Sequence, residues 1–476
     1  MPVREIRWQN FRAFKDTGWL PIRPITVLLG ANNSGKSSIL TPLLLLKQTL
    51  RSERAQSALV VRGDLTNAGS FHDFVHAHAP QSRVTFSIRF HRRPSAGTTE
   101  PELGRNAPGV AEFTFKSERA PGVVSLHRYA VNDAFGRPLL VRTKQGSSRR
   151  YSLEEIEEWA PGLDSEPESA SDSAARTAIL KAVPYHFLFD SDSIWSEALE
   201  VASRRATNDS AKEDQDESLR EAEAVQMSSF VTKYSSAVDF TGEHIQSDLK
   251  DVLYLGPLRE IPKRLYELSG DAPRDVGVRG QFSPEILLRA RNKTLFKQVN
   301  RWLKQFGLPG ELTCRPMTDT AFELLLDGSE HPATNFADVG FGFSQLLPLL
   351  VQGLTASRSN LLITEQPEIH LNPRLQSRLA DFFLTVNKRG SSVLIETHSE
   401  HLVLALRRLV AEGRIEAADV AIYYVEAGVG ESTVRPVPLQ ENGHINKLDW
   451  PSGFFEDVLR ESFALASAQA RRRSAE

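Results

Sequence analysis

Residues 25–38 read ITVLLGANNSGKSS, and this stretch decides the fold. From Gly30 to Ser37 it follows the spacing Gly-x-x-x-x-Gly-Lys-Ser of a phosphate-binding loop. The apolar residues Ile25–Leu29 predict a buried strand before the loop, and the pattern after it predicts a helix over Lys36–Arg51. A chance glycine loop would lack this strand-and-helix context. The stretch therefore predicts a P-loop nucleotide-binding fold, with backbone N–H groups facing phosphates at the start of the helix.

Each position of the loop has an expected role. Lys36 is expected to reach the β- and γ-phosphates of ATP, and the Ser37 hydroxyl is expected to ligate Mg²⁺. The other candidate nucleotide-binding residues of the loop are Gly30, Asn32, Asn33, Ser34, Gly35 and Ser38.

A second candidate element lies far downstream, where residues 361–373 read LLITEQPEIHLNP. An apolar strand here ends in Glu365. P-loop enzymes hold the magnesium shell with an acid at such a strand end. Glu365 is therefore predicted to share the metal with Ser37.

Two shorter pieces flank this strand. Residues 338–346 read DVGFGFSQL, so paired glycines open an apolar helix whose N-terminus would suit an anion. Gly340, Gly342 and Ser344 are candidate nucleotide contacts because of their place just ahead of the acidic strand. Residues 393–400 read VLIETHSE, which predicts a strand delivering His398 at its C-terminal edge, where ligands bind in open α/β sheets.

The rest of the chain suggests how these motifs are organised. From residue 360 onward strands alternate with helices, which predicts an α/β fold with a mainly parallel sheet. Val3–Leu29 is expected to hold two strands, and the period-two pattern over Val84–Tyr151 predicts an antiparallel β arm. A helix is expected from Ser152 onward.

The expected parts of the chain are an N-terminal half of an ATPase head (1–151), a helical and partly disordered insertion (152–250), a C-terminal half (251–440) and a tail docking on the head (441–476). The insertion contains the acidic, serine-rich run Leu163–Ser173 and a second polar run, Asn208–Glu223.

Composition indicates the cellular location of the protein but leaves its partner open. The net charge is −3, so bulk electrostatics do not indicate nucleic acid. Basic pairs such as Arg407–Arg408 nevertheless leave nucleic acid open as a partner. With one cysteine, Cys314, the chain cannot form an internal disulfide, and a reducing cytoplasmic location is expected. The longest apolar run, Ile39–Leu46, is too short to span a bilayer, so no membrane partner is expected.

Together these motifs resemble the ABC-type ATPase heads of the RecF, SMC and OLD (overcoming lysogenisation defect) proteins. Residues 6–15, IRWQNFRAFK, resemble the strand that precedes the loop in those heads. Gly340–Leu346 resembles their signature motif, Glu365–Pro373 their Walker B and D-loop, and His398 their H-switch. Within this group, the run from Gln366 to Pro373 and the tail Trp450–Phe455 are most similar to stand-alone bacterial ATPases of the AAA-15/AAA-21 type.

The resemblance implies ATP and Mg²⁺ as cofactors and a homodimer that closes around ATP. It also implies a role in anti-phage defence or DNA processing, with an effector such as a nuclease encoded in the same operon. OLD-type nucleases carry an additional Toprim domain. Only about fifty residues follow Glu426 here and they contain no Asp-x-Asp pair, so no Toprim domain is expected.

Two positions depart from the family pattern. Where the family has a catalytic glutamate after the Walker B acid, this chain has Gln366, which can orient water but cannot accept its proton. Glu368 is the candidate to replace it; otherwise turnover is slow. Gly340 occupies the place of the signature serine, so the backbone at Gly340 and Gly342, or the Ser344 hydroxyl, would have to contact the γ-phosphate.

Three functions remain open from the sequence. The first is an ATPase whose hydrolysis switches a dimer between states. The second is a scaffold that holds ATP with little turnover, for which Gln366 is the sequence hint. The third is a DNA-end or DNA-clamp repair protein, which the basic pairs allow and the near-neutral charge disfavours.

Overall fold

The computed structural model describes residues 3–449 apart from 54–56, 80, 91–107, 119–122, 134–137, 146–150, 155–176, 183, 190, 210–216, 271, 291–293, 329–331 and 447. The described chain divides into two compact units. The first holds residues 3–21, Ser37–Val252 and Gly428–Ser432; the second holds Ile22–Lys36, Leu253–Ala427 and the described residues from Thr433 onward. The runs Leu163–Ser173 and Trp450–Phe455, and part of the run Asn208–Glu223, lie outside the described residues.

A six-stranded sheet forms the centre of the second unit. Its order is β10 (Val252–Leu255), β15 (Leu361–Glu365), β16 (Ser392–Glu396), β4 (Ile25–Gly30), β17 (Val420–Ala427) and β18 (Ser432–Pro436). β16 pairs in parallel with both β15 and β4, and β4 pairs in parallel with β17. Every residue of β4, β15 and β16 is buried, which explains their continuous apolar sequences. The predicted parallel sheet is confirmed, and because β4, β15 and β16 run parallel, the segments that follow them leave the sheet at one edge.

The helices beside this sheet begin close to the strand ends. Helix α10 (Pro373–Lys388) packs against α11 (Glu400–Ala411). Asn372 caps α10 by accepting a hydrogen bond from the Leu375 N–H, and Ser399 caps α11 in the same way from Leu402. The caps fix where each strand-to-helix connection ends, and so hold the residues just after β15 and β16 at the edge of the sheet.

The remaining elements of the second unit surround a smaller sheet. Its strands are β11 (Tyr266–Glu267), β12 (Glu311–Pro316), β13 (Ala321–Asp327) and β14 (Thr334–Asn335), all paired in antiparallel fashion. The helices are α7 (Ser283–Arg289), α8 (Thr294–Gln305) and α9 (Phe341–Thr355), with the short 3-10 turns η2 (Phe336–Asp338) and η3 (Ala417–Asp419). α8 and α7 both pack on α9, which carries the signature-like turn at its start.

The first unit contains the predicted β arm. Its eight-stranded antiparallel sheet is formed by β1 (Val3–Phe11), β2 (Phe14–Asp16), β3 (Leu20–Pro21), β5 (Val84–Phe90), β6 (Pro108–Ser117), β7 (Val124–Asp133), β8 (Pro138–Lys144) and β9 (Tyr151–Glu154). Two expectations were wrong here. Residues 3–29 hold four strands rather than two, because β2 and β3 are short strands added to β1. The helix expected from Ser152 does not begin there, since Ser152–Glu154 pairs with β8.

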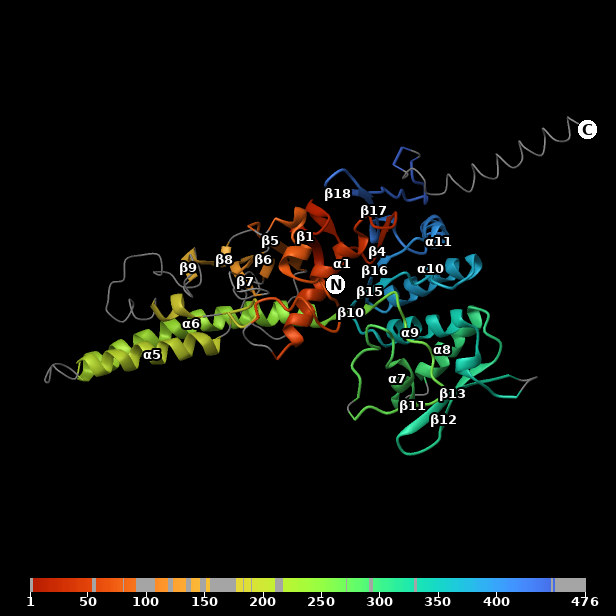
Figure 1. The fold of residues 1–476 in the computed structure, drawn as a ribbon, viewed down its shortest axis with the longest axis horizontal. Coiled ribbons are helices and arrows are strands. Elements are labelled where there is room, and N and C mark those ends of the chain that lie inside the picture. The colour runs from red at the N-terminus through yellow and green to blue at the C-terminus, as the bar shows by residue number, and fades with distance from the viewer. Residues whose placement is uncertain are drawn as a thin grey trace, which may run out of the picture. The chain divides into compact units, whose positions relative to one another are not determined.

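Helices supply the rest of the first unit. The P-loop helix α1 (Lys36–Arg51) has the predicted bounds, and α2 (Phe71–Phe74) and η1 (His76–His78) follow it. α5 (Ser191–Asp209) packs against α6 (Glu217–Lys250), whose 34 residues make it about 51 Å long (Figure 1). Within the range predicted as a helical insertion, 152–250, the described residues include these two helices, and the insertion as a separate part of the chain stays a prediction. No helix in the described part of the chain is long and apolar enough to cross a membrane.

Lys47 joins α1 to the end of α6. Its buried ammonium donates hydrogen bonds to the carbonyls of Lys250 (2.8 Å), Leu249 (3.5 Å) and Val252. The carbonyls of Leu249 and Lys250 stand at the C-terminus of α6, where a helix leaves its last acceptors unpaired and favours a positive charge, and Val252 begins β10. The long helix is thereby fixed to the helix that begins at the P-loop.

Candidate functional site

The phosphate loop follows β4 and depends on glycine at its first position. Gly30 has φ of 151°, and a Cβ there would lie 2.4 Å from the Val425 carbonyl oxygen on the neighbouring strand. No side chain fits that space, so the loop can leave the sheet only at a glycine. Ser34 and Ser38 are buried, whereas Asn32, Asn33 and Ser37 are exposed. The exposed residues of the loop are thus two that carry amide side chains and the serine predicted to bind the metal.

Lys36 lies inside this loop. Its Nζ donates hydrogen bonds to the carbonyl oxygens of Gly30 (2.9 Å) and Ala31 (2.7 Å), and the residue is only 4% exposed. Burial lowers the pKa of Lys36, while the charges of Glu396 and Glu368 act in the opposite direction. The charge of Lys36 therefore interacts with two carboxylates, Glu396 at the end of β16 and Glu368 in the turn after β15.

Glu365 ends β15 and is held by a tyrosine. The Tyr254 hydroxyl donates a 2.6 Å hydrogen bond to Glu365 Oε1, and both residues are buried. Burial, followed by the charge of Glu365, raises the pKa of Tyr254, so the tyrosine is a neutral donor at physiological pH. Arg259 donates from Nη2 to the backbone carbonyl of Glu365 at 3.3 Å. Two residues therefore hold Glu365: Tyr254, which lies in β10, and Arg259, which comes after it.

Glu368 lies in the turn after β15. Its Oε1 accepts a 2.7 Å hydrogen bond from the backbone N–H of His398, and its Oε2 is buried with no hydrogen-bond partner among the described residues. Burial raises the pKa of Glu368, and the hydrogen bond from His398 limits the rise. A carboxylate with a raised pKa and one open oxygen has the properties of a general base.

Gln366 and His398 border the same edge. Gln366 adopts the left-handed region at φ 44°, and its N–H donates to the Glu396 carbonyl at 2.7 Å, which joins the ends of β15 and β16. Burial and then the charge of Lys36 lower the pKa of His398, so its imidazole is neutral at neutral pH. The charge of Lys36 thus influences His398 and interacts with that of Glu368, and the His398 N–H bonds to Glu368.

The signature-like turn has two kinds of glycine. Gly340 is exposed at the N-cap of α9, and a Cβ there would meet only Phe343, at 4.0 Å. A Cβ on Gly342 would lie 2.8 Å from the His370 carbonyl oxygen, so Gly342 is required for packing against the turn after Glu368. Ser344 is buried one turn into the helix. Of the three predicted contacts, Gly340 alone is an exposed residue.

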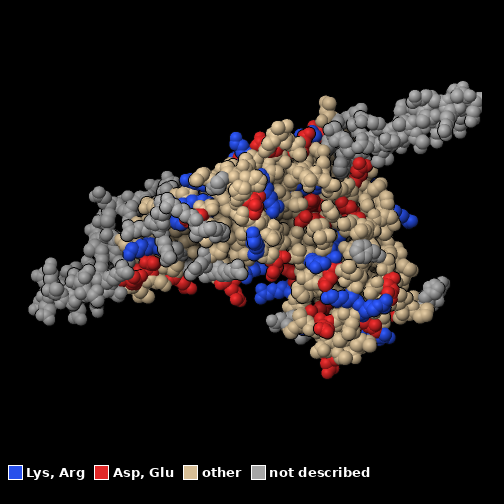
Figure 2. All heavy atoms as spheres, in the orientation of Figure 1, with Lys and Arg blue, Asp and Glu red and all other residues tan. Residues whose placement is uncertain are grey.

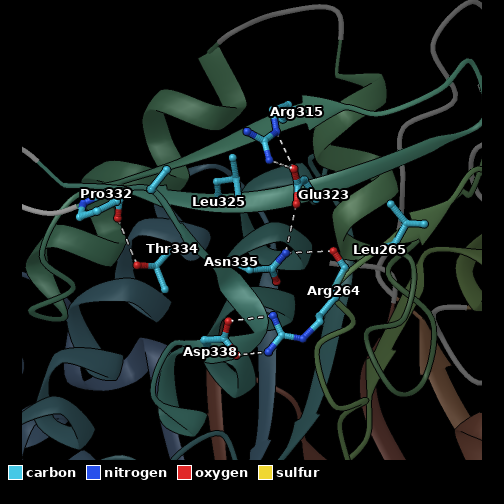
Figure 3. A pocket seen from close by; sticks show the side chains of 10 residues that line it. Arg264, Leu265, Arg315, Glu323, Leu325, Pro332, Thr334, Asn335 and Asp338 are labelled. Atoms are coloured by element: carbon cyan, nitrogen blue, oxygen red, sulfur yellow. Dashed lines mark hydrogen bonds and ion pairs between the residues drawn. The ribbon is translucent and has the colours of Figure 1, made fainter.

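A surface hollow near this turn is lined by charged residues that pair with one another (Figure 3). Arg264 forms two hydrogen bonds to the Asp338 carboxylate, at 2.6 and 3.0 Å, and Arg315 pairs with Glu323. The charges that line the hollow are therefore already paired with one another. The Arg264–Asp338 pair connects the segment after β10 to the residues just before Gly340.

The residues fit a nucleotide triphosphate and Mg²⁺. Gly30 at the start of the loop packs against the Val425 carbonyl and the Ser34 side chain with no room for a Cβ. Among the described residues, several buried polar atoms of the loop and of the segments after β10 and β15 have no hydrogen-bond partner: Ser34 Oγ, Glu368 Oε2, and Nε and Nη1 of Arg259. The ligands predicted for the metal, the Glu365 carboxylate and the Ser37 hydroxyl, are oxygen donors of the kind that Mg²⁺ accepts when phosphates and water complete its shell.

Comparison with known families agrees with this geometry. Residues 163–405, more than half of the chain, match the family model described as "AAA domain, putative AbiEii toxin, Type IV TA system". The chain belongs to this AAA-domain family. Residues 1–85 match a model of the AAA ATPase domain, and residues 415–465 match one described as a protein of unknown function, DUF3696. The parallel sheet and the loop after β4 give this AAA-domain protein an α/β P-loop fold.

Solved SMC head domains are also similar to this AAA-domain protein. The Smc head from Pyrococcus furiosus, bound to the C-terminal domain of ScpA, is 14% identical with a TM-score of 0.42, over 92% of this chain and 97% of that chain. The SMC head from Thermotoga maritima is 11% identical with a TM-score of 0.39, over 92% and 99% of the two chains. No curated protein matches the sequence.

Sequence reasoning missed three residues at this edge: Tyr254, Arg259 and Glu396. Tyr254 lies in β10 and Arg259 shortly after it, more than one hundred residues before Glu365. No spacing rule connects the two segments. The short apolar strand Val252–Leu255 was the available signal, because a strand next to the acid-bearing one places its end at the same edge.

Proposed function

We propose that this protein hydrolyses ATP with Mg²⁺. The observation that carries the proposal is the meeting of Lys36, Glu368 and His398 at one edge of the parallel sheet, beside the Glu365 held by Tyr254. Lys36 would balance charge on the β- and γ-phosphates, and Glu365 with Ser37 would hold the metal. Bound Mg²⁺ would supply neutralisation of phosphate charge.

Glu368 is the proposed base. The oxygen of a water molecule bonds to the γ-phosphorus while the bond to the β,γ-bridging oxygen breaks, leaving ADP and inorganic phosphate. The proton that the water loses passes to Glu368 Oε2, which is buried and has no hydrogen-bond partner among the described residues. Gln366 would orient the water, and neutral His398 would donate a hydrogen bond to the departing phosphate.

We further propose that two copies complete each site. The signature turn of one copy, through Gly340, Gly342 and Ser344, would contact the γ-phosphate held by the loop of the other. Closure of such a homodimer would be transmitted to an effector protein through the helical insertion, 152–250, because Lys47 fixes α6 to the P-loop helix. The parts 1–151 and 251–440 would act as the two halves of the head, with 441–476 as a tail on it.

The biological setting is proposed as bacterial anti-phage defence or DNA processing in the cytoplasm. The family description, which names a toxin of a type IV toxin–antitoxin system, supports a defence role. The alternative of an ATP-bound scaffold is favoured by Gln366 in place of an acid. A DNA clamp receives less support, because Lys and Arg side chains are interspersed with Asp and Glu on the face that Figure 2 draws.

A phosphate-release assay under multiple turnover tests this function. Wild-type protein with Mg²⁺ and ATP is expected to release phosphate continuously, and Lys36→Ala is expected to release none above background, because the phosphates lose their main counter-charge. Binding of ATP without turnover would favour the scaffold. Turnover that depends on added duplex DNA would favour the clamp. Wild-type turnover in Lys36→Ala would refute the assignment of the loop.

A further inference from the structure

Arg259 is buried at the catalytic edge although nothing in the sequence marks it. It stands four residues after β10, and its side chain is turned inward: Arg259 is 5% exposed, while the preceding Leu258 is 75% exposed. β10 is the neighbour of β15 in the sheet, so this segment leaves the sheet beside Glu365. The path of the backbone thus places a buried guanidinium group beside Glu365, at the proposed ATP site.

Most of the donors of this guanidinium have no acceptor. Nη2 reaches the Glu365 backbone carbonyl at 3.3 Å, but Nε and Nη1 are buried without a hydrogen-bond partner among the described residues. A guanidinium group is charged at neutral pH. A buried charged donor without an acceptor is costly, so its persistence calls for a ligand that supplies acceptors.

Glu368 does not supply them. It attracts Arg259 electrostatically, yet the two side chains form no ion pair, and Glu368 Oε2 is itself without a partner in the described part of the chain. Arg259 has unused hydrogen-bond donors and Glu368 an unused acceptor, so a group that accepts from one and donates to the other would satisfy both. A water molecule next to a phosphoryl group has that character.

We propose that Arg259 is a catalytic residue that binds the γ-phosphate of ATP in its own chain, opposite the Glu368 base. This inference rests on the proposed ATPase function. The planar guanidinium offers donors in a fork that matches phosphate oxygens, which an ammonium cannot reproduce. Because ADP lacks the γ-phosphate, Arg259 should distinguish ATP from ADP.

Nucleotide titration with Mg²⁺ tests the assignment, using ADP and the non-hydrolysable analogue AMP-PNP as probes. Arg259→Ala is expected to bind AMP-PNP about 10–100-fold more weakly than wild type while its ADP affinity stays within about twofold. Phosphate release should fall about 10³-fold, as expected for loss of an arginine on the transferred group. Arg259→Lys should recover only part of the AMP-PNP affinity. Arg274→Ala, which removes an exposed arginine of the same unit, is the matched control and should behave as wild type.

The ADP measurement separates the outcomes. Equal losses for ADP and AMP-PNP in both Arg259 variants would assign Arg259 a structural role and overturn the proposal, as would unchanged AMP-PNP affinity in Arg259→Ala. Failure of the wild-type protein to bind either nucleotide would refute the ATPase function itself, and the Arg259 assignment with it. Selective loss of AMP-PNP affinity supports both.

Discussion

The backbone N–H of His398 donates a 2.7 Å hydrogen bond to Glu368 Oε1, which joins the turn after β15 to the end of β16. This bond fixes one oxygen of the carboxylate and leaves the other directed elsewhere without a partner among the described residues. It also places the acid and the imidazole at the end of adjacent parallel strands, near Lys36. The chemistry proposed for this edge depends on that arrangement.

The first prediction concerns the base. Glu368→Gln keeps an oxygen that can accept from His398 but cannot take a proton, so ATP binding should persist while turnover falls about 10²–10⁴-fold. Gln366→Glu should raise turnover if the protein is slow because the usual acid is missing. Phosphate release and nucleotide titration measure both effects. Unchanged rates in both variants would refute the roles given to this turn.

The second prediction follows from the raised pKa of Glu368. The ionised base is required, so turnover should rise with pH through a midpoint above 4.5, the ordinary value for glutamate. The folded protein also holds this proton more tightly than the unfolded chain. Wild type should therefore lose stability relative to Glu368→Gln as pH rises from about 4.5 through the raised folded pKa. Denaturation curves of both proteins from pH 4 to 8 measure the difference; a gap that does not grow with pH would contradict the burial argument.

The third prediction concerns metal binding. Tyr254→Phe removes the hydroxyl that holds Glu365 Oε1 without changing the shape of the ring. Loss of such an outer partner typically weakens a metal site about 10–100-fold. The Mg²⁺ concentration for half-maximal phosphate release should rise by that factor, with recovery at saturating metal. A lower maximal rate with unchanged Mg²⁺ dependence would show that Glu365 is not the metal ligand.

The fourth prediction concerns the connection between α1 and α6. Lys47→Met keeps the aliphatic stem and removes the ammonium that satisfies carbonyls at the end of α6. Hydrogen bonds to a charged group contribute roughly 2–3 kcal/mol, so the free energy of unfolding should fall by about that amount. Hydrogen exchange near Lys250 should accelerate while ADP affinity is retained. Unchanged exchange there would argue against a mechanical link through Lys47.

Local chemistry made part of this structure predictable. The spacing from Gly30 to Ser37 and the apolar run after it identified the loop and a helix with the observed bounds, because both signals lie within one continuous segment. The strands over Leu361–Glu365 and Ser392–Glu396 were visible for the same reason. β2 and β3 were missed, since two or three residues are too few to show a period.

The contacts that orient the site were less accessible. Tyr254 meets Glu365 because β10 and β15 are neighbours in the sheet, and strand order is a property of the whole fold. The reason why residue 342 is a glycine could not be predicted either. Gly342 packs against His370, and the two residues lie in segments that are separate in the sequence. The roles of the predicted ATP- and metal-binding residues remain predictions.

The central claim, that each ATP site is shared between two copies, is tested most directly by mixing two inactive variants. Lys36→Ala damages the loop only. Gly340→Asp damages the signature turn only, since a side chain fits at this exposed N-cap and aspartate favours the helix while its charge repels phosphate. A mixed dimer then has one intact composite site and one doubly damaged site. We predict that each variant alone releases no phosphate above background and that the mixture recovers activity. No recovery, with mixed dimers present by native mass spectrometry, would contradict the shared site.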